Sequence, residues 1–237
     1  MMRIGLIGCG HIGTVHSWAL KQLFEAELVD ARITATFDTD PERATRLAEP
    51  HEAKAVSDLG ALCDSVDVAW ICTWTAAHLE AVEAATDRGL PVFCEKPLAP
   101  TLADCRKLAT LLHRVPHQVG LVLRHAPVFA NVAEAVASGR YGRPMALVLR
   151  DDQYFPIQGM YGSTWRADVS KAGGGTLIEH SIHDLDVIQW ILGVPDSVSA
   201  RMATRFGYPG IDDAASLLLS YPDGGMANHC ASAAMVG

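Results

Sequence analysis

The sequence predicts an α/β protein: an N-terminal doubly wound parallel sheet, then an α+β domain with a mostly antiparallel, open sheet. Through residues 1–123, short apolar strands alternate with helical segments, the pattern of a parallel sheet covered on both faces. A glycine-rich turn joins the first strand to the first helix, where such sheets bind ligands. In residues 124–237 the strands are longer, and a hairpin turn joins the last two. We therefore expect two domains, divided after residue 123.

The glycine-rich turn reads Gly8-Cys9-Gly10-His11-Ile12-Gly13 and follows a buried strand over residues 3–7. Gly8 permits a tight turn, Gly10 allows the backbone to approach a pyrophosphate, and Gly13 allows the next helix to pack against the strand. The amides and the positive end of that helix, expected over residues 14–25, would then face the phosphates. The pattern predicts a Rossmann domain that binds a dinucleotide through this turn.

A carboxylate stands where such a domain binds the ribose. A second strand over residues 32–37 ends at Asp38, 25 residues after Gly13, and the usual spacing is about 20 residues. Asp38 should accept hydrogen bonds from both ribose hydroxyls and repel a 2′-phosphate, and no arginine follows it directly. We therefore expect NAD rather than NADP.

The remaining elements of the first domain follow from caps, apolar runs and glycine stops. They are a helix from Pro41 to Leu47 capped by Asp40, a strand at 55–56, a helix from Ser57, a strand at 67–72, a helix at 76–88, a strand at 91–94, a helix from Thr101 to His113, and a strand at 118–123. Gly8, Asp38, Thr73 and Lys96 each follow a strand. Because parallel strands end at one edge of the sheet, we expect these four residues at its ligand-binding edge.

The second domain has a different order of elements. We expect a helix at 127–139, a turn at 142–144, a strand at 145–154, an irregular loop through 165–166, a helix from Glu179 to Leu192, and strands at 197–206, 214–221 and 226–234. The turn Pro222-Asp223-Gly224-Gly225 predicts that the last two strands form an antiparallel hairpin. The pair Asp212-Asp213 is expected in a solvated turn.

Composition argues against several classes of protein. The net charge is −8 and no run of lysine or arginine is present, which argues against nucleic-acid and anionic-membrane partners. No apolar stretch is long enough to span a bilayer, and the first strand leaves no room for a cleaved targeting segment. The 6 cysteines are scattered without a Cys-x-x-Cys pair, which is typical of free thiols in a reducing compartment. We expect a cytoplasmic protein.

Several of these segments together resemble one family of oxidoreductases, named for glucose–fructose oxidoreductase, inositol dehydrogenase and MocA. The similarity extends along almost the whole chain and rests on the glycine turn, Asp38, residues 73–78, Glu95-Lys96-Pro97, Arg124 with Pro127, the glycines at 173–175, and Glu179-x-x-x-His183. It implies NAD(P)-dependent hydride transfer on a sugar, cyclitol or related polyol. Two departures are Thr73-Trp74-Thr75, where the family usually has Thr-Pro-Asn, and Glu179, where it usually has Asp.

The resemblance implies that Lys96 and His183 are catalytic and that Glu179 supports them. Oxidation of a secondary alcohol needs a base for the hydroxyl proton, and histidine titrates nearest to neutral pH. Glu179 and His183 are four positions apart in an expected helix, so the carboxylate could orient the ring. Lys96 could hydrogen-bond the reacting oxygen. The neighbouring His180 is interpreted as a packing residue.

The resemblance also implies which residues bind the cofactor and the substrate. The cofactor residues are Gly8, Gly10, His11, Ile12, Gly13, Asp38, Thr73, Trp74, His78, Glu95 and Lys96, with capping or packing as the alternative role of His78. The substrate cleft would be lined by Arg124, His125, Tyr154, Trp165 and Arg166. No metal site is expected. The Lys96–Pro97 bond is a candidate for the cis form.

Other functions remain as alternatives. The cluster Glu179, His180, His183, Asp184 and Asp186 could hold the metal of a hydrolase or isomerase, although its spacing is not that of a zincin and it leaves Lys96 unexplained. Some relatives of the family are NAD-dependent glycosidases, in which the nucleotide is oxidised and re-reduced within one turnover. A third alternative is a sugar-sensing binder without catalysis, against which the three catalytic candidates argue.

The end of the chain predicts an incomplete second domain. Residues 226–237 contain no Asp, Glu, Lys or Arg and end inside an expected strand, which would leave an apolar edge able to pair with other chains. The resemblance implies a longer chain and a homo-oligomer, dimer or tetramer, formed on the open face of the sheet. We expect this chain alone to bind NAD weakly, to turn over poorly and to aggregate.

Overall fold

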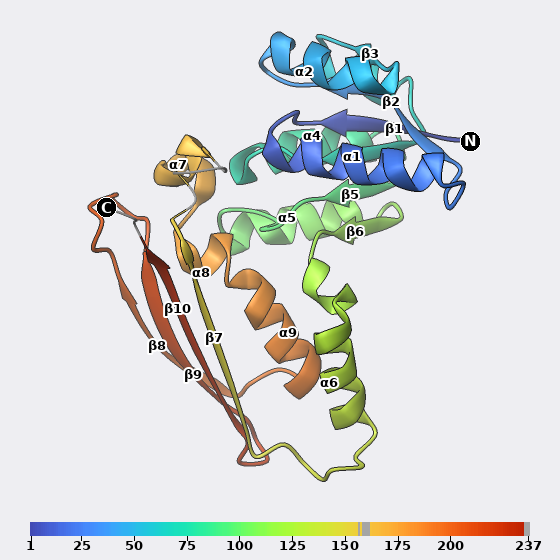
Figure 1. Ribbon diagram of the computed structural model, residues 1–237. Helices are drawn as coiled ribbons and strands as arrows, with labels where there is room; N and C mark the ends of the chain where they lie inside the picture. Colours follow the sequence, from blue (N-terminus) through green and yellow to red (C-terminus); the bar gives the residue numbers. More distant parts are fainter. Residues whose placement is uncertain (156, 158–161, 235–237) are drawn as a thin grey trace. The chain divides into compact units, whose positions relative to one another are not determined.

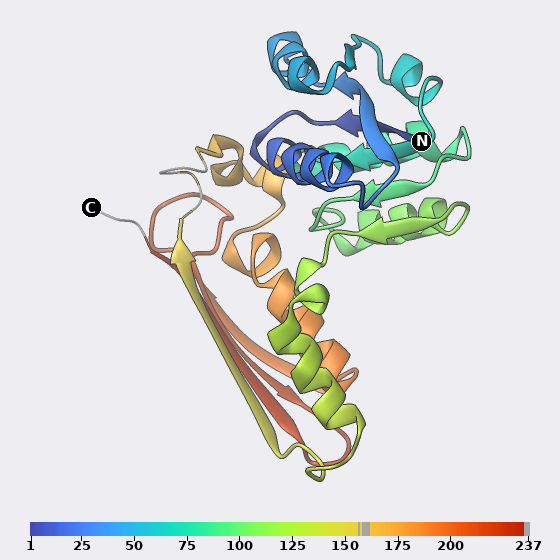
Figure 2. The same ribbon diagram turned by 45° about the vertical axis from the view of Figure 1, so that its right-hand side comes forward.

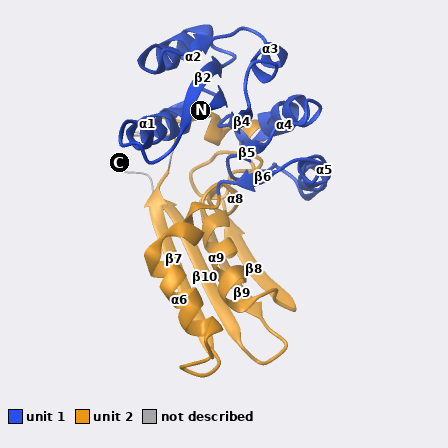
Figure 3. Ribbon diagram, turned by 90° about the vertical axis from the view of Figure 1, so that its right-hand side faces the viewer, with its two compact units in different colours: residues 1–120 blue, residues 121–237 orange. Residues whose placement is uncertain are grey.

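The computed structural model describes residues 1–155, 157 and 162–234 (Figure 1). The chain divides into two compact units, Met1–Gly120 and Leu121–Gly237, which Figure 3 colours separately. This division lies close to the boundary predicted after residue 123. A six-stranded parallel sheet forms the first unit and a four-stranded, mostly antiparallel sheet forms the second, so the predicted fold class is confirmed.

All strand pairings in the first sheet are parallel, and the strand order is β3-β2-β1-β4-β5-β6. The strands are β1 Met2–Ile7, β2 Ala31–Phe37, β3 Lys54–Ala55, β4 Val68–Ile71, β5 Val92–Cys94 and β6 His117–Val119. The chain moves outward from β1 to β3 and then returns to β4 on the other side of β1. The carboxyl ends of β1 and β4 therefore flank the topological switch point, where doubly wound sheets bind ligands.

Helices cover both faces of this sheet (Figure 3). They are α1 His11–Glu25, α2 Pro41–Ala48, α3 Leu59–Cys63, α4 His78–Thr86 and α5 Leu102–Leu112, with 3-10 turns η1 Glu49–His51 and η2 Thr75–Ala77. Along β1, Ile4 and Leu6 pack in one core with α1 and α2, while Ile7 packs in a second core with α3, α4 and α5. The alternation of side chains along a strand produces this division.

Caps set where three of these helices begin. The Asp40 side chain accepts hydrogen bonds from two amides of α2, and Thr101 accepts one from the Asp104 amide of α5, so both predicted caps are confirmed. The helix expected from Ser57 begins instead at Leu59, because Asp58 accepts a hydrogen bond from the Ala61 amide and is the N-cap.

The second unit packs helices against one face of its sheet (Figure 2). Its elements are η3 Val122–His125, α6 Pro127–Ala137, β7 Ala146–Tyr154, η4 Thr164–Ala167, α7 Val169–Ala172, α8 Thr176–Glu179, α9 Ile182–Leu192, β8 Ser197–Ala203, β9 Ala214–Ser220 and β10 Met226–Ala234. The strand order is β7-β10-β9-β8; the β7–β10 pair is parallel, and the β10–β9 and β9–β8 pairs are antiparallel. The predicted hairpin of β9 and β10 is confirmed.

Three strand predictions were wrong, one at the end of the first domain and two in the second. The strand expected at 118–123 ends at Val119, because the chain then turns into η3. The strand expected to reach Phe206 ends at Ala203, because the amides of Arg205 and Phe206 donate to the buried carboxylate of Asp213. The last strand is not a free edge, because β10 pairs with β7 on one side and β9 on the other. Residues 235–237 lie outside the described part of the chain.

Within residues 1–155, 157 and 162–234, no helix is both long enough and apolar enough to cross a lipid bilayer.

Candidate active site

The glycine turn after β1 has the geometry that its sequence predicts. Gly8 has a φ of 93°, and a Cβ there would lie 2.6 Å from the Cys72 backbone. A Cβ on Gly13 would lie 2.3 Å from the Gly8 carbonyl oxygen, so both positions exclude a side chain. A Cβ on Gly10 would meet no atom within 4 Å. Gly10 is the N-cap of the 15-residue helix α1 and has no side chain, so no side chain at this position covers the amino end of the helix.

Asp38 is held beside this turn by two backbone amides. Its Oδ2 accepts a hydrogen bond from the Cys9 amide at 2.7 Å, and its Oδ1 accepts one from the Asp40 amide at 2.9 Å. Each carboxylate oxygen keeps capacity for a further hydrogen bond. Burial, with the Asp38 charge nearby, raises the pKa of the Cys9 thiol to about 12, so the thiol adds no charge to the turn at neutral pH.

His78 connects two loops at the ligand-binding edge of the sheet. The residue is 1% exposed; its Nδ1 lies 3.2 Å from the Leu98 carbonyl oxygen, and its Nε2 lies 3.3 Å from that of Thr73. Burial lowers the pKa of His78, although these contacts oppose the shift. The ring thus joins the loop after β4 to the loop after β5, which matches the packing role left open by the sequence. Trp74, half-buried, precedes η2 in the first of these loops.

The segment Glu95-Lys96-Pro97 follows β5, and the predicted cis Lys96–Pro97 bond is confirmed. Lys96 is half-buried and follows directly after Glu95, whose carboxylate is buried. Oε1 of Glu95 lies 2.7 Å from Nε2 of His16, and Oε2 accepts the Lys96 amide at 3.0 Å. Burial opposes ionisation of Glu95, but the His16 contact and the Lys96 amide outweigh it and lower its pKa. His16 was not singled out in the sequence.

Glu179 and His183 do not share one continuous helix, so that prediction was wrong. The helix expected from Glu179 to Leu192 is interrupted: α8 ends at Glu179 and α9 begins at Ile182. The amides of both His180 and Ser181 donate to the Thr176 carbonyl oxygen, at 3.1 and 2.9 Å. Because one carbonyl takes both donors, the regular i to i−4 ladder is broken at this point. The four-residue spacing of a helix face therefore does not relate the two side chains.

Glu179 instead contacts a residue predicted to line the substrate cleft. Its Oε2 lies 3.2 Å from Nε of Arg166, whose guanidinium lies 4.3 Å from the centre of the Trp165 ring. Glu179 is 6% exposed, so this is a buried carboxylate paired with a cation. Three candidate residues from two different segments are thus brought together within the second unit.

The other residues predicted to line the substrate cleft lie on other elements of the second unit. Arg124, on η3, forms two hydrogen bonds of 2.7 Å with the two carboxylate oxygens of Asp186 on α9. His125 is the last residue of η3, and Tyr154 is the last residue of β7, where its side chain is exposed. The Arg124–Asp186 pair fixes η3 against α9.

A second acidic and histidine cluster lies between the sheet and α9. Oδ2 of Asp151, on β7, lies 2.6 Å from Nε2 of His180, so the packing role expected for His180 is replaced by an ion-pair geometry. Asp184 faces His229, with Oδ2 and Nε2 3.8 Å apart, and both residues are buried. Burial, with the Asp151 charge, raises the pKa of Asp184 to about 7, and burial lowers that of His229. The sequence signal that was missed is a polar residue at an inward position of an alternating strand, namely Asp151 in β7 and His229 in β10.

Three residues of the possible metal cluster contact different groups. Glu179 contacts Arg166, His180 contacts Asp151, and Asp186 pairs with Arg124. Among the residues that the structure describes, no group of three or more His, Cys, Asp or Glu side chains is placed to hold a metal ion. The metal-dependent alternative therefore has no cluster to support it.

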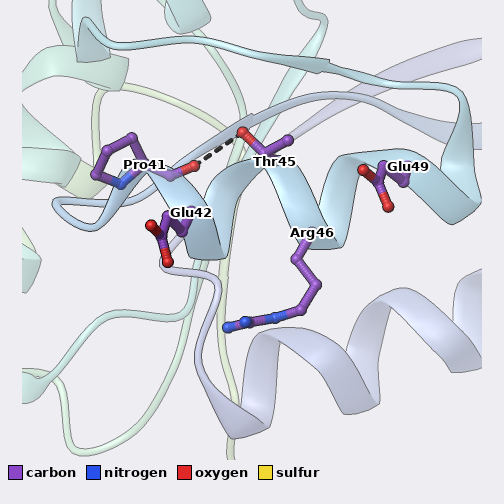
Figure 4. Close-up of a pocket in the computed structure, with 5 residues that line it drawn as sticks. All are labelled: Pro41, Glu42, Thr45, Arg46 and Glu49. Carbon is purple, nitrogen blue, oxygen red and sulfur yellow. Dashed lines mark hydrogen bonds between the residues drawn. The ribbon is translucent and has the colours of Figure 1, made fainter.

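A depression on the surface of α2, of about 340 Å³, contains none of the candidate residues (Figure 4). It is lined by Pro41, Glu42, Thr45, Arg46 and Glu49. All five residues are exposed, and Thr45 donates its hydroxyl hydrogen bond back to the Pro41 carbonyl of the same helix. Its lining therefore adds nothing to the site at the carboxyl ends of the strands.

Comparison with protein families matches both units. Residues 2–122 match the model described as an oxidoreductase family with an NAD-binding Rossmann fold. Residues 129–237 match the model of the GFO/IDH/MocA C-terminal domain. The two matches follow one another in the same order as the two sheets of the structure.

Individual relatives agree with the family matches. The chain is 32% identical over 196 residues to myo-inositol dehydrogenase Hyg17 of Streptomyces leeuwenhoekii, covering 81% of this chain and 56% of the relative. It is 30% identical over 235 residues to inositol 2-dehydrogenase of Rhizobium meliloti (strain 1021), covering 94% of this chain and 66% of the relative. A crystal structure of a probable dehydrogenase from Thermotoga maritima is similar, with a TM-score of 0.83 and 28% identity, covering 98% of this chain and 68% of that one. The chain spans less than two thirds of the length of these two curated relatives.

Proposed function

The chain belongs to the Gfo/Idh/MocA family of oxidoreductases, and on this basis we propose that it is an NAD-dependent dehydrogenase of a sugar, cyclitol or related polyol. The observation that carries the proposal is the glycine turn with Asp38 beside it. Gly10 leaves the amino end of α1 open for a pyrophosphate, and the Asp38 carboxylate is fixed by the Cys9 amide with capacity left for ribose hydroxyls. This arrangement fits NAD and disfavours a 2′-phosphate.

The nicotinamide, when bound, supplies the hydride acceptor or donor. The chain's own residues must then bind the substrate and move one proton to or from its hydroxyl. We assign proton transfer to His183, a hydrogen bond to the reacting oxygen to Lys96, and support of these two to Glu179. The buried carboxylate of Glu179 is paired with the Arg166 guanidinium, which supports an electrostatic role for this pair.

The remaining cofactor residues are proposed to shape the binding site rather than to take part in the reaction. His11, Ile12, Thr73, Trp74, His78 and Glu95 shape the loops around the dinucleotide. Arg124, His125, Tyr154, Trp165 and Arg166 are proposed as substrate-side residues. Two inositol dehydrogenases among the relatives favour a cyclitol within the wider class of polyols. We also propose that the functional form is a homo-oligomer.

A substrate panel tests this function. The chain is incubated with NAD and, separately, with myo-inositol, other cyclitols, hexoses and their polyols, and NADH formation is followed by absorbance. NADH should form with at least one of these, faster with NAD than with NADP. Release of free sugar from a glycoside without net NADH would instead indicate the glycosidase reaction. Binding of sugars without either reaction would indicate a sensing protein.

A further inference from the structure

His16 is a polar ring inside an aromatic environment on α1. Its ring lies edge-on to Trp70 of β4 and Phe93 of β5, with centroids 5.8 and 5.3 Å away. Trp70 and Phe93 also contact each other at 5.6 Å. The His16 side chain is 27% exposed, so these two rings hold it over the sheet. The position therefore fixes the direction in which its Nε2 points.

Nε2 of His16 lies at one oxygen of a buried carboxylate. The distance to Oε1 of Glu95 is 2.7 Å, and the Glu95 side chain is 10% exposed. A carboxylate this buried requires hydrogen-bond partners to remain ionised. The His16 contact is among the causes that lower the pKa of Glu95 despite its burial. His16 is thus part of what keeps Glu95 charged in this place.

The other carboxylate oxygen of Glu95 holds the backbone of Lys96. Oε2 accepts the Lys96 amide at 3.0 Å. Gly120, after β6, also lies beside this carboxylate: a Cβ there would lie 3.1 to 3.2 Å from both carboxylate oxygens. The absence of a side chain at Gly120 leaves the space that the carboxylate occupies. Each carboxylate oxygen of Glu95 therefore has its own partner, His16 for Oε1 and the Lys96 amide for Oε2.

We propose that His16 is a positioning residue for Lys96, acting through the carboxylate of Glu95. The proposal rests on the role proposed for Lys96 in hydride transfer. α1 begins at the glycine turn that would meet the pyrophosphate, and the same helix carries His16 to the Glu95 carboxylate. One rigid helix thus sets both the cofactor's phosphates and the backbone from which Lys96 projects. A reacting group displaced by a fraction of an ångström loses rate while the cofactor still binds.

Two substitutions at His16 test the proposal. His16→Leu keeps an apolar side chain against the two aromatic rings and removes the donor, whereas His16→Gln keeps a donor that can reach Glu95. The control is His113→Leu at an exposed histidine that follows α5. We expect His16→Leu to lower kcat about 10-fold or more while the Kd for NAD changes less than about threefold. His16→Gln should recover most of kcat, and the control should match the wild type.

A second readout does not depend on turnover. Hydrogen exchange of the Lys96 amide, followed by NMR, should be about 10-fold faster in His16→Leu and near wild type in His16→Gln. If His16→Leu does not fold, Glu95→Gln replaces it in this comparison. Exchange of the Lys96 amide should then be faster in Glu95→Gln than in His16→Gln.

The outcomes separate the two proposals. Absence of turnover in the wild type with every polyol overturns the proposed function, and Lys96 exchange then decides the His16 proposal alone. Unchanged exchange in His16→Leu overturns the link through Glu95. A loss of NAD affinity as large as the loss of kcat assigns His16 a general structural role and also overturns the proposal.

Discussion

Nε of Arg166 lies 3.2 Å from Oε2 of Glu179, a carboxylate that is 6% exposed at the end of α8. The contact joins η4 to α8, two elements that are separated in the sequence by α7. A charge buried in this way is costly when its counter-ion is removed. Removal of one partner of this pair should therefore destabilise the second unit, whatever the role of the pair in catalysis.

This contact predicts an effect of Arg166→Met on stability. The substitution keeps an unbranched side chain against Trp165 and removes the cation facing Glu179. We expect the free energy of unfolding, measured in urea, to fall by about 1–3 kcal/mol. The control Arg143→Met breaks an exposed pair with Asp223 at 3.9 Å, and it should change stability by no more than about 0.5 kcal/mol. Equal effects of the two substitutions would contradict a buried pair.

Cofactor choice provides a second prediction. Asp38→Asn keeps an oxygen for one of the two amides at the glycine turn and removes the charge that disfavours a 2′-phosphate. The ratio of the Kd values for NADP and NAD should exceed about 10 in the wild type and fall about 10-fold in the variant. Asp40→Asn makes the same charge change two positions away, at the cap of α2, and should leave the ratio unchanged. Titration by protein fluorescence measures all four constants.

The first unit could be predicted closely because its signals are local. Apolar runs specified strands buried on both faces, and Asp40 and Thr101 marked helix starts with their own side chains. The glycine turn was equally local, since Gly8 and Gly13 lie where a side chain would collide with backbone. A resemblance to a known family then gave the candidate catalytic residues, which composition and spacing do not identify.

The second unit was less predictable because its polar groups are satisfied by distant segments. Asp212 and Asp213, expected in a solvated turn, are buried. The Asp212 carboxylate accepts the amides of Gly175 and Leu177, and no local pattern predicts such a contact. The break between α8 and α9 could not be predicted from the local sequence either, because the apolar pattern of residues 179–192 is that of one continuous helix.

The proposed catalytic roles predict matched losses of turnover. Lys96→Ala and His183→Ala should each lower kcat by about 100-fold, because each removes a group assigned to the reacting oxygen or its proton. The Kd for NAD should change little in both. Lys107→Ala, at an exposed lysine paired with Asp104, is the control for loss of positive charge. If the two residues act in one step, the double variant should lose less than the product of the single losses. Wild-type turnover in either single variant would refute the assignment.

The stability of the second unit should depend on pH through Asp184. Its pKa is raised from 3.8 to about 7, first by burial and then by the Asp151 charge and hydrogen bond. Between these two values the folded state binds more protons than the unfolded state, so the free energy of unfolding falls as pH rises through this window. Each pH unit contributes at most about 1.4 kcal/mol. The pKa of His229 is lowered from 6.5 by burial, so its titration acts in the opposite direction below pH 6.5.

Asp184→Asn isolates this contribution, because the amide remains neutral at every pH. The free energy of unfolding of the variant minus that of the wild type should rise by about 1 kcal/mol or more from pH 5 to pH 8. The groups facing Asp184, namely Asp151 and His229, are present in both proteins, so their titration largely cancels in the difference. Urea unfolding at several pH values measures it, with Asp196→Asn at an exposed position after α9 as the control. Parallel pH profiles of wild type and Asp184→Asn would show that Asp184 ionises in the folded state as it does in the unfolded chain.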